Sequence, residues 1–219
     1  MERLTNNIAS KIAEELQLDN DSREIIAYGM FVIVDIALTI LLVIIFGLLF
    51  HVTVEALIVC FTGSILRKYS GGAHAGSPGK CAVITTVICV GLALFFTFLI
   101  APVITPRLLI LLGIGIFPLS YYLIYKLAPV DSSSKPIKKK EKRDRMKKGS
   151  IFVLCGYIIL VAINAIIYFY TKNKSFIVYS MCVYGGSAWQ VFTLTKAGHT
   201  TVNKMDEFLS RILTIKKRR

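Results

Sequence analysis

The chain has 219 residues, of which 55% are hydrophobic and 18% are charged, with a formal net charge of +13 and a mean hydropathy of +0.65. The interior of a soluble domain of this length could not bury so much apolar surface, so the composition excludes a soluble globular protein. It indicates a single integral membrane domain over residues 1–219.

Residues 1–23 lack the apolar core of a signal peptide. Apolar residues recur in this range every four positions, which predicts an amphipathic helix lying in the membrane interface: Leu4, Ile8, Ile12 and Leu16. Acidic side chains outnumber basic ones here, so packing against a basic part of the same protein explains the pattern as well as lipid binding does. A surface helix with no part in substrate docking is the simpler alternative.

Six apolar runs follow, each near the roughly 20 residues that a helix needs to cross a bilayer. We therefore expect an all-α, polytopic membrane protein with about six transmembrane helices. The turn between the first two runs is expected anywhere from Gly47 to Glu55. In the last run, Gly185 and Gly186 permit a close approach of a neighbouring helix. The runs span residues 25–46, 48–66, 81–104, 108–127, 150–171 and 176–195.

Two carboxylates, Asp35 and Glu55, fall inside these runs. Intramembrane carboxylates are expensive and often mark an ion or substrate path, so they favour the alternative of a carboxylate-dependent transporter or peptide exporter. Against this alternative, no inverted repeat is evident in the sequence. Asn164, Gln190 or a lysine reaching in from a neighbouring segment could also satisfy the two carboxylates.

One polar, glycine-rich stretch, Arg67 to Thr86, interrupts the apolar runs and holds a histidine and a cysteine, His74 and Cys81. A thiol with an ordinary pKa of about 8.5 is only a few per cent thiolate at neutral pH, so a nucleophilic cysteine needs a helix N-terminus, a cation or an imidazole nearby. The other cysteines lie in apolar runs and are expected to be small core side chains without disulfides: Cys60, Cys89, Cys155 and Cys182.

The glycine-rich stretch offers all three of these features. Ser77 before Pro78 predicts an N-cap followed by the first helical residue, which places Cys81 in or just after the first turn of a helix. The helix dipole and the positive charge of Lys80 favour a negative sulfur at that position. Glycines on both sides of His74 permit the turns that would bring its imidazole to the thiol.

Two other interpretations of the histidine and cysteine remain open. Their closeness in sequence can be coincidence, since side-chain proximity is not sequence proximity. A zinc site would need three or four ligands, and the chain has only three histidines and no C-x-x-C pair, so we expect no metal and no other cofactor. His199 is a second candidate base, although it has no glycine loop or cysteine beside it.

Two segments carry a family resemblance. The first reads R-x-x-x-G-G-x-H-A from Arg67, with Cys81 seven residues after the histidine, and the second is A-P-V-D-S-S-S-K-P-I, from Ala128 to Ile137. In this order they resemble the accessory gene regulator protein B (AgrB) family of bacterial membrane peptidases, and the similarity in length and hydropathy covers essentially the whole chain. The resemblance implies that His74 and Cys81 are the catalytic pair and that Arg67 and Gly72 are also required.

Basic residues accumulate on the cytoplasmic side of membrane proteins. With six spans and both termini inside, only Arg107, Lys172 and Lys174 of the 26 basic residues remain outside. This topology makes residues 128–149 a basic cytoplasmic loop and residues 196–219 a basic cytoplasmic tail. It places the active site at the cytoplasmic face of what the resemblance implies is a bacterial cell membrane.

Segment 135–148 is dense in basic side chains and has no aromatic residue. Nucleic-acid binding is therefore not expected, since single strands stack on aromatic side chains, and contact with anionic membrane lipid is the first interpretation. The resemblance implies a second, because the family's substrates are small propeptides with an amphipathic leader and a largely acidic C-terminal tail. The candidate residues for docking that tail are Asp131, Lys135, Lys138, Lys139 and Lys140.

The predicted activity is that of a cysteine endopeptidase. His74 takes the proton of Cys81, whose sulfur attacks a peptide carbonyl near the precursor's C-terminal tail and forms a thioester. Ser77, or the backbone N–H groups near Lys80 and Cys81, would hold the oxyanion, and no third triad member is evident. The resemblance implies that the substrate is a quorum-sensing autoinducer propeptide, that the product is cyclised to a thiolactone, and that the enzyme is a homodimer.

Overall fold

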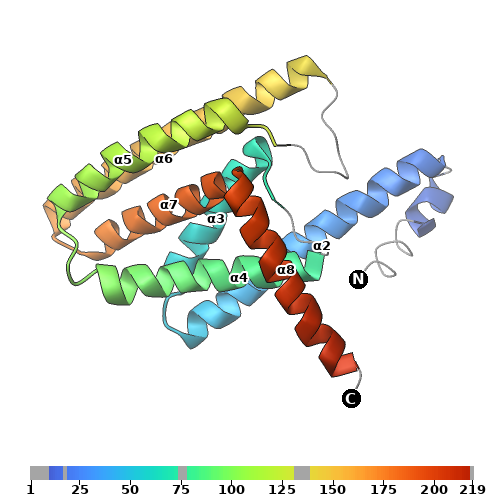
Figure 1. Ribbon diagram of the computed structural model, residues 1–219, viewed down its shortest axis with the longest axis horizontal. Coiled ribbons are helices and arrows are strands. Elements are labelled where there is room, and N and C mark those ends of the chain that lie inside the picture. The colour runs from blue at the N-terminus through green and yellow to red at the C-terminus, as the bar shows by residue number, and fades with distance from the viewer. Residues whose placement is uncertain (1–9, 17–18, 74–77, 131–138, 218–219) are drawn as a thin grey trace.

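The computed structural model describes residues 10–16, 19–73, 78–130 and 139–217. These residues form helices joined by short turns, with one isolated β-bridge between Gly71 and Val130, so the predicted all-α class is confirmed. In chain order the helices are α2 (Asn20–Leu49), α3 (Thr53–Ser70), α4 (Pro78–Leu94) with its π-helical continuation η1 (Phe95–Ile100), α5 (Pro106–Leu127), α6 (Lys140–Thr171), α7 (Ser175–Phe192) and α8 (Lys196–Lys217) (Figure 1).

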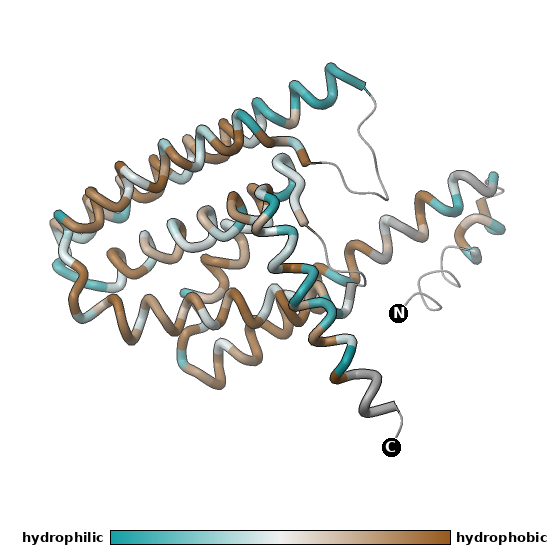
Figure 2. Tube along the Cα trace, viewed as in Figure 1, coloured by the Kyte–Doolittle hydropathy of each residue, from teal (hydrophilic) through white to brown (hydrophobic). Residues whose placement is uncertain are grey.

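Four of these helices are long and apolar enough to cross a membrane, namely α2, α4 with η1, α5 and α6. Their outward faces are apolar (Figure 2), as in Leu111 and Phe169, which are more than half exposed. Such faces belong against lipid, and the chain is therefore a helical membrane protein. Helices α3 and α7 have 18 residues each, and α3 also carries three charged side chains. The number of six spans stays a prediction.

Local sequence explains several helix boundaries. The turn at residues 50–52 separates α2 from α3 inside the predicted interval, Gly47 to Glu55. Helix α4 begins at Pro78, as predicted. Helix α5 begins at Pro106, where the Thr105 side chain accepts a hydrogen bond of 3.3 Å from the Leu108 N–H. Proline suits a first helical position because its missing N–H would have no partner there.

The basic segments differ from the sequence-based expectation. The predicted loop over residues 128–149 is helical from Lys140 onward, and the predicted tail over residues 196–219 is mostly helix α8. Lysine, glutamate and arginine are good helix formers, and hydropathy marks where a chain leaves the membrane rather than where a helix must end. Of the predicted amphipathic helix over residues 1–23, residues 10–15 are helical and the first nine lie outside the described part of the chain.

Helices α3 and α7 form the centre of the bundle. The most extensive helix contact is between these two, and α2, α4, α5 and α6 pack around them. Two buried tyrosine hydroxyls cross between helices: Tyr157 donates to the Thr62 carbonyl oxygen (2.6 Å) and Tyr184 to the Leu109 carbonyl oxygen (3.2 Å). A residue at Gly186 with a Cβ would place that atom 2.8 Å from the Val59 carbonyl oxygen, so the glycine sets the approach of α7 to α3.

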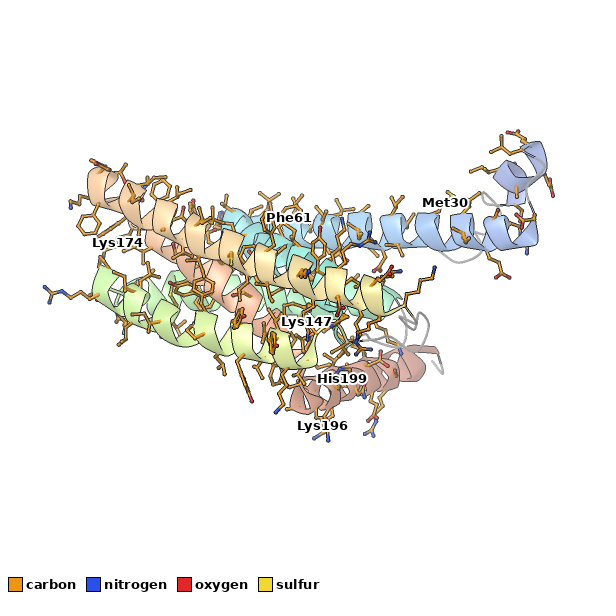
Figure 3. The ribbon with its side chains drawn as sticks, turned by 90° about the horizontal axis from the view of Figure 1, so that it is seen from above. Met30, Phe61, Lys147, Lys174, Lys196 and His199 are labelled. Carbon is orange, nitrogen blue, oxygen red and sulfur yellow. The ribbon has the colours of Figure 1, made fainter. Side chains whose placement is uncertain are left out.

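Charged side chains gather toward the two ends of the bundle. Lys174 lies at one end, and Lys147, Lys196 and His199 lie toward the other (Figure 3). This separation is the one expected for the predicted topology, whose sidedness stays a prediction.

Replacing Gly186 with alanine should lower the free energy of unfolding by about 1–3 kcal/mol, because the new methyl group must displace the α3 backbone. The measurement is thermal or denaturant unfolding in detergent micelles. Gly156→Ala on α6 is the matched control, since a Cβ there meets nothing within 4 Å. Equal losses of stability in both variants would contradict the close α3–α7 packing.

Candidate active site

Cys81 lies in the first turn of α4, as the sequence predicts, and its side chain is half-buried. It opens into a cavity of about 20 Å³, enough for a single water molecule. The cavity wall combines residues of α3, α4, the end of α7 and α8. Among the described residues it consists of Arg67, Ala73, Cys81, Ile84, Thr85, Trp189, Thr193 and Val202.

Arg67 is the cation that faces Cys81. It belongs to the last turn of α3 and lines the same cavity, where its guanidinium attracts negative charge on the Cys81 sulfur. Its Nη2 group also donates a hydrogen bond to the Ala73 carbonyl oxygen, six residues further along. Arg67 therefore orients the backbone that leads to His74 and supplies positive charge to the sulfur.

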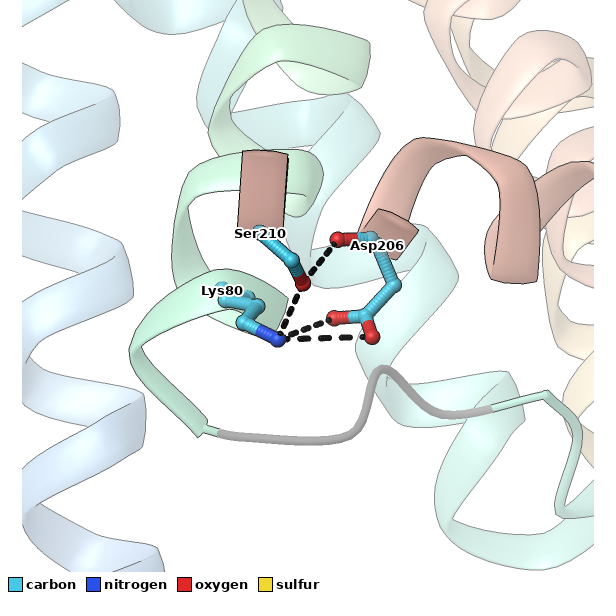
Figure 4. Close-up of polar contacts among 3 residues, drawn as sticks. All are labelled: Lys80, Asp206 and Ser210. Atoms are coloured by element: carbon cyan, nitrogen blue, oxygen red, sulfur yellow. Dashed lines mark hydrogen bonds and ion pairs between the residues drawn. The ribbon is translucent and has the colours of Figure 1, made fainter. Parts of the chain in front are cut away.

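Lys80, which the sequence suggests as the activating cation, is engaged elsewhere. Its Nζ lies 3.3 Å from Asp206 Oδ1 and donates a hydrogen bond of 2.8 Å to Ser210 Oγ (Figure 4). Both partners belong to α8. The two cations near Cys81 thus have different partners, Arg67 the Ala73 backbone within the glycine-rich stretch and Lys80 the C-terminal helix.

The two glycines after α3 adopt backbone angles that other residues rarely take. Gly71 has φ +68° and Gly72 has φ +137°. At Gly71 the backbone meets the second family-like segment: the Val130 N–H donates to the Ser70 carbonyl oxygen (2.9 Å), and a Cβ on Gly71 would lie 2.1 Å from the Val130 carbonyl oxygen. The two motifs therefore meet through the backbones of Gly71 and Val130, which are 59 positions apart in sequence.

Gln190 is a site residue that sequence reasoning assigned to another task. It does not satisfy an intramembrane carboxylate; its Nε2 donates to the Gly71 carbonyl oxygen (2.7 Å) and to Ser70 Oγ (3.1 Å). The Ala73 N–H adds a bond of 3.2 Å to the Thr193 carbonyl oxygen. A buried amide in an apolar helix must find hydrogen-bond partners, and this requirement was the sequence signal for a role of Gln190. The sequence could not show which groups these partners are.

Several predicted site residues lie outside the described residues: His74, Ser77, Asp131, Lys135 and Lys138. The remaining docking candidates, Lys139 and Lys140, are exposed at the start of α6. Ala73, which directly precedes His74, lines the cavity beside Cys81.

The other candidate groups lie apart from this cavity. Cys60, Cys89 and Cys182 are buried, as expected, while Cys155 is exposed on α6, contrary to its expected place in the core. His199 lies in the first turn of α8 and is not among the described residues that line the cavity. Asp35 has a buried oxygen, Oδ1, without a hydrogen-bond partner in the described part of the chain.

The arrangement suits nucleophilic chemistry by a thiolate. A helix N-terminus and a guanidinium both favour negative sulfur. Ile84, Trp189 and Val202 give the cavity apolar walls that limit water around the sulfur. No group of three histidine, cysteine or acidic side chains suited to a metal ion occurs among the residues that the structure describes.

Replacing Gly72 with alanine should reduce both stability and any activity that depends on Cys81. The Cβ would lie 2.7 Å from Thr193 Oγ1 and 3.2 Å from Gln190 Nε2, at a φ that alanine disfavours, so the cost should be about 1–3 kcal/mol. Thermal unfolding and the rate of Cys81 alkylation are the measurements. Gly91→Ala, at an unobstructed position of α4, is the control and should leave both unchanged.

The chain is similar to known proteins of one family. The family model of Accessory gene regulator B matches residues 5–194. AgrB-like protein 2 of Clostridium perfringens (strain 13 / Type A) is 37% identical over 215 residues, which cover 97% of this chain and all of that protein. An AgrB-like protein of Clostridium perfringens (strain SM101 / Type A) is 38% identical over 221 residues, with the same coverage. No solved structure matches the chain. The chain therefore belongs to the accessory gene regulator B family, a family involved in quorum-sensing peptide processing.

Proposed function

We propose that this protein is an integral-membrane cysteine endopeptidase that removes the C-terminal tail of a quorum-sensing autoinducer propeptide. The observation that carries the proposal is the position of Cys81, in the first turn of α4 and in one cavity with Arg67. The other four cysteines lie in the interiors of α3, α4, α6 and α7 rather than at a helix start. Family membership supports the substrate class.

In the proposed reaction His74 accepts the thiol proton and the Cys81 sulfur attacks the carbonyl carbon of the scissile peptide bond. The oxyanion is held by Ser77 or by the free N–H groups at the start of α4. Collapse of the intermediate breaks the C–N bond, and His74 returns its proton to the leaving amine of the tail fragment. The N-terminal fragment remains bound to Cys81 as a thioester.

Ring closure requires no further energy source. A cysteine thiol within the bound fragment attacks the thioester carbonyl, a new thioester forms, and the Cys81 thiolate leaves with its proton restored by the base. Exchange of one thioester for another is close to neutral in free energy, so the outcome depends on positioning and on excluding water. The apolar walls at Ile84, Trp189 and Val202 support a thiolactone product over the hydrolysed acid.

The proposed substrate approaches from the cytoplasmic side, where the acidic tail meets the basic segment that includes the exposed Lys139 and Lys140. Neighbouring lysines of the same segment contact anionic lipid. In this proposal both termini are cytoplasmic and the active enzyme is a homodimer.

Cys81→Ala and His74→Ala should each reduce cleavage of the propeptide by about a thousandfold or more, because nucleophile and base act as a unit. The measurement is the rate of tail release by protein reconstituted in liposomes. Cys155→Ala, at an exposed cysteine remote from the cavity, should retain full activity. Wild-type rates for Cys81→Ala would refute the endopeptidase, and loss of function in Asp35→Asn or Glu55→Gln instead would favour the transporter.

A covalent intermediate should be detectable on Cys81. Protein incubated with a synthetic propeptide, containing an amphipathic leader, an internal cysteine and an acidic tail, should gain the mass of the N-terminal fragment, located to Cys81 by peptide mapping. Changing the internal cysteine of the peptide to alanine should increase the trapped adduct, because ring closure is blocked. Arg67→Lys should slow adduct formation about tenfold, since lysine keeps the charge but loses the planar donor array. An adduct on any other cysteine would contradict the assignment.

A further inference from the structure

The C-terminal helix α8 crosses α4 near the end where Cys81 lies (Figure 1). Gly198, Val202, Asp206 and Ser210 recur every four residues and so share one side of α8. This side faces the site: Val202 is 5% exposed and lines the Cys81 cavity, and Asp206 and Ser210 contact Lys80. Helix α8 begins after residue 194, where the match to the family model ends.

Among the described residues, the space beside the nucleophile is small. A cavity of about 20 Å³ accommodates one water molecule, whereas a peptide carbonyl and its flanking residues need many times that volume. Movement of one of the described walls would widen the approach to Cys81.

Of the described walls, the one contributed by α8 is the least tied to the rest of the bundle. The α3, α4 and α7 walls belong to the packed bundle, in which the backbones of α3 and α7 touch at Gly186. Helix α8 is joined to α7 by a turn of three residues, 193–195, and its polar contact with α4 is partly exposed, with Lys80 at 21% and Asp206 at 20%. Water can therefore take the place of these partners when the helix moves.

The start of α8 is anchored, so movement would be a swing of the helix about that point. Thr195 Oγ1 accepts a hydrogen bond from the Gly198 N–H (3.1 Å) and donates one to the Phe192 carbonyl oxygen (2.8 Å). A Cβ on Gly198 would lie 2.0 Å from the Phe192 carbonyl oxygen. Any side chain at this position would therefore push the first turn of α8 away from α7.

We propose that α8 is a hinged cover over Cys81, held closed by the contacts of Asp206 and Ser210 with Lys80. Closed, the cover shields the thiol; open, it exposes the cavity and frees the Lys80 ammonium from its α8 partners for an incoming peptide. The cover goes beyond the proposed peptidase function, and its test measures access to the sulfur rather than peptide cleavage. Failure of either proposal can thus be recognised separately.

The test compares how fast Cys81 reacts with two water-soluble thiol reagents, small methyl methanethiosulfonate and a bulky polyethylene-glycol maleimide. The full-length protein is reconstituted in nanodiscs, and modification of Cys81 is quantified by mass spectrometry of its peptide. A change in the intrinsic reactivity of the sulfur alters both rates alike, whereas opening of the cover raises the rate with the bulky reagent more. The informative quantity is therefore the ratio of the bulky to the small rate.

Asp206→Asn and Ser210→Ala should each raise this ratio about two- to fivefold, the factor expected for loss of a partly exposed polar contact. Gly198→Ala should raise it without any change of charge. Glu207→Gln, an exposed neighbour with the same loss of charge as Asp206→Asn, is the control and should match wild type. The exchange of charges in Lys80→Asp combined with Asp206→Lys should return the ratio toward the wild-type value, while Lys80→Asp alone should raise it.

An unchanged ratio in Asp206→Asn, Ser210→Ala and Gly198→Ala would overturn the cover. An equal rise in Glu207→Gln would also overturn it, because the effect would then follow net charge rather than the contact with Lys80. If the double variant kept a ratio as high as that of Lys80→Asp alone, the pairing with Asp206 would not be what holds the helix closed.

Discussion

The structure around Cys81 depends on the side chain of one buried glutamine. Gln190 holds the Gly71 carbonyl and the Ser70 hydroxyl against α7, while Val130 pairs with Ser70 from the other side. Without these bonds the Ser70 and Gly71 carbonyl oxygens would lose these partners, and a buried carbonyl left without one costs about 1–3 kcal/mol. The amide thus converts a glycine-rich stretch into a fixed support that ends at Ala73, on the wall of the cavity.

This support explains why the glycines are needed where they are. Gly71 lies against the Val130 backbone and Gly72 against Gln190 and Thr193, so neither position has space for a Cβ. Arg67 then closes the segment from the α3 side through the Ala73 carbonyl. Helix α3, helix α7 and the segment at Val130 therefore orient the residues that lead into the site. The geometry of the site depends on the contact between α3 and α7.

The sequence predicts where most of the helices lie, but it does not predict which side chains contact one another across them. Apolar runs located the membrane helices, and the proline at position 78 located the start of α4 with Cys81 in its first turn. The sequence could not show that Arg67 rather than Lys80 faces the sulfur, because Lys80 is drawn away by Asp206, 126 residues later. Helix α8 was missed because its weakly apolar, basic composition looks like a solvated tail, although its polar and apolar residues separate cleanly.

The backbone bridge between Gly71 and Val130 joins the chain beside the proposed docking segment to the chain beside the proposed base. Val130 is the last described residue before the basic segment, and Ser70 and Gly71 precede His74, the proposed base, by only a few positions. Under the proposed function, an acidic tail bound at the basic segment would act through this one pair of peptide groups on the residues next to His74. Binding of the tail and alignment of the proposed base would then be a single event, and a peptide lacking its tail would be a poor substrate.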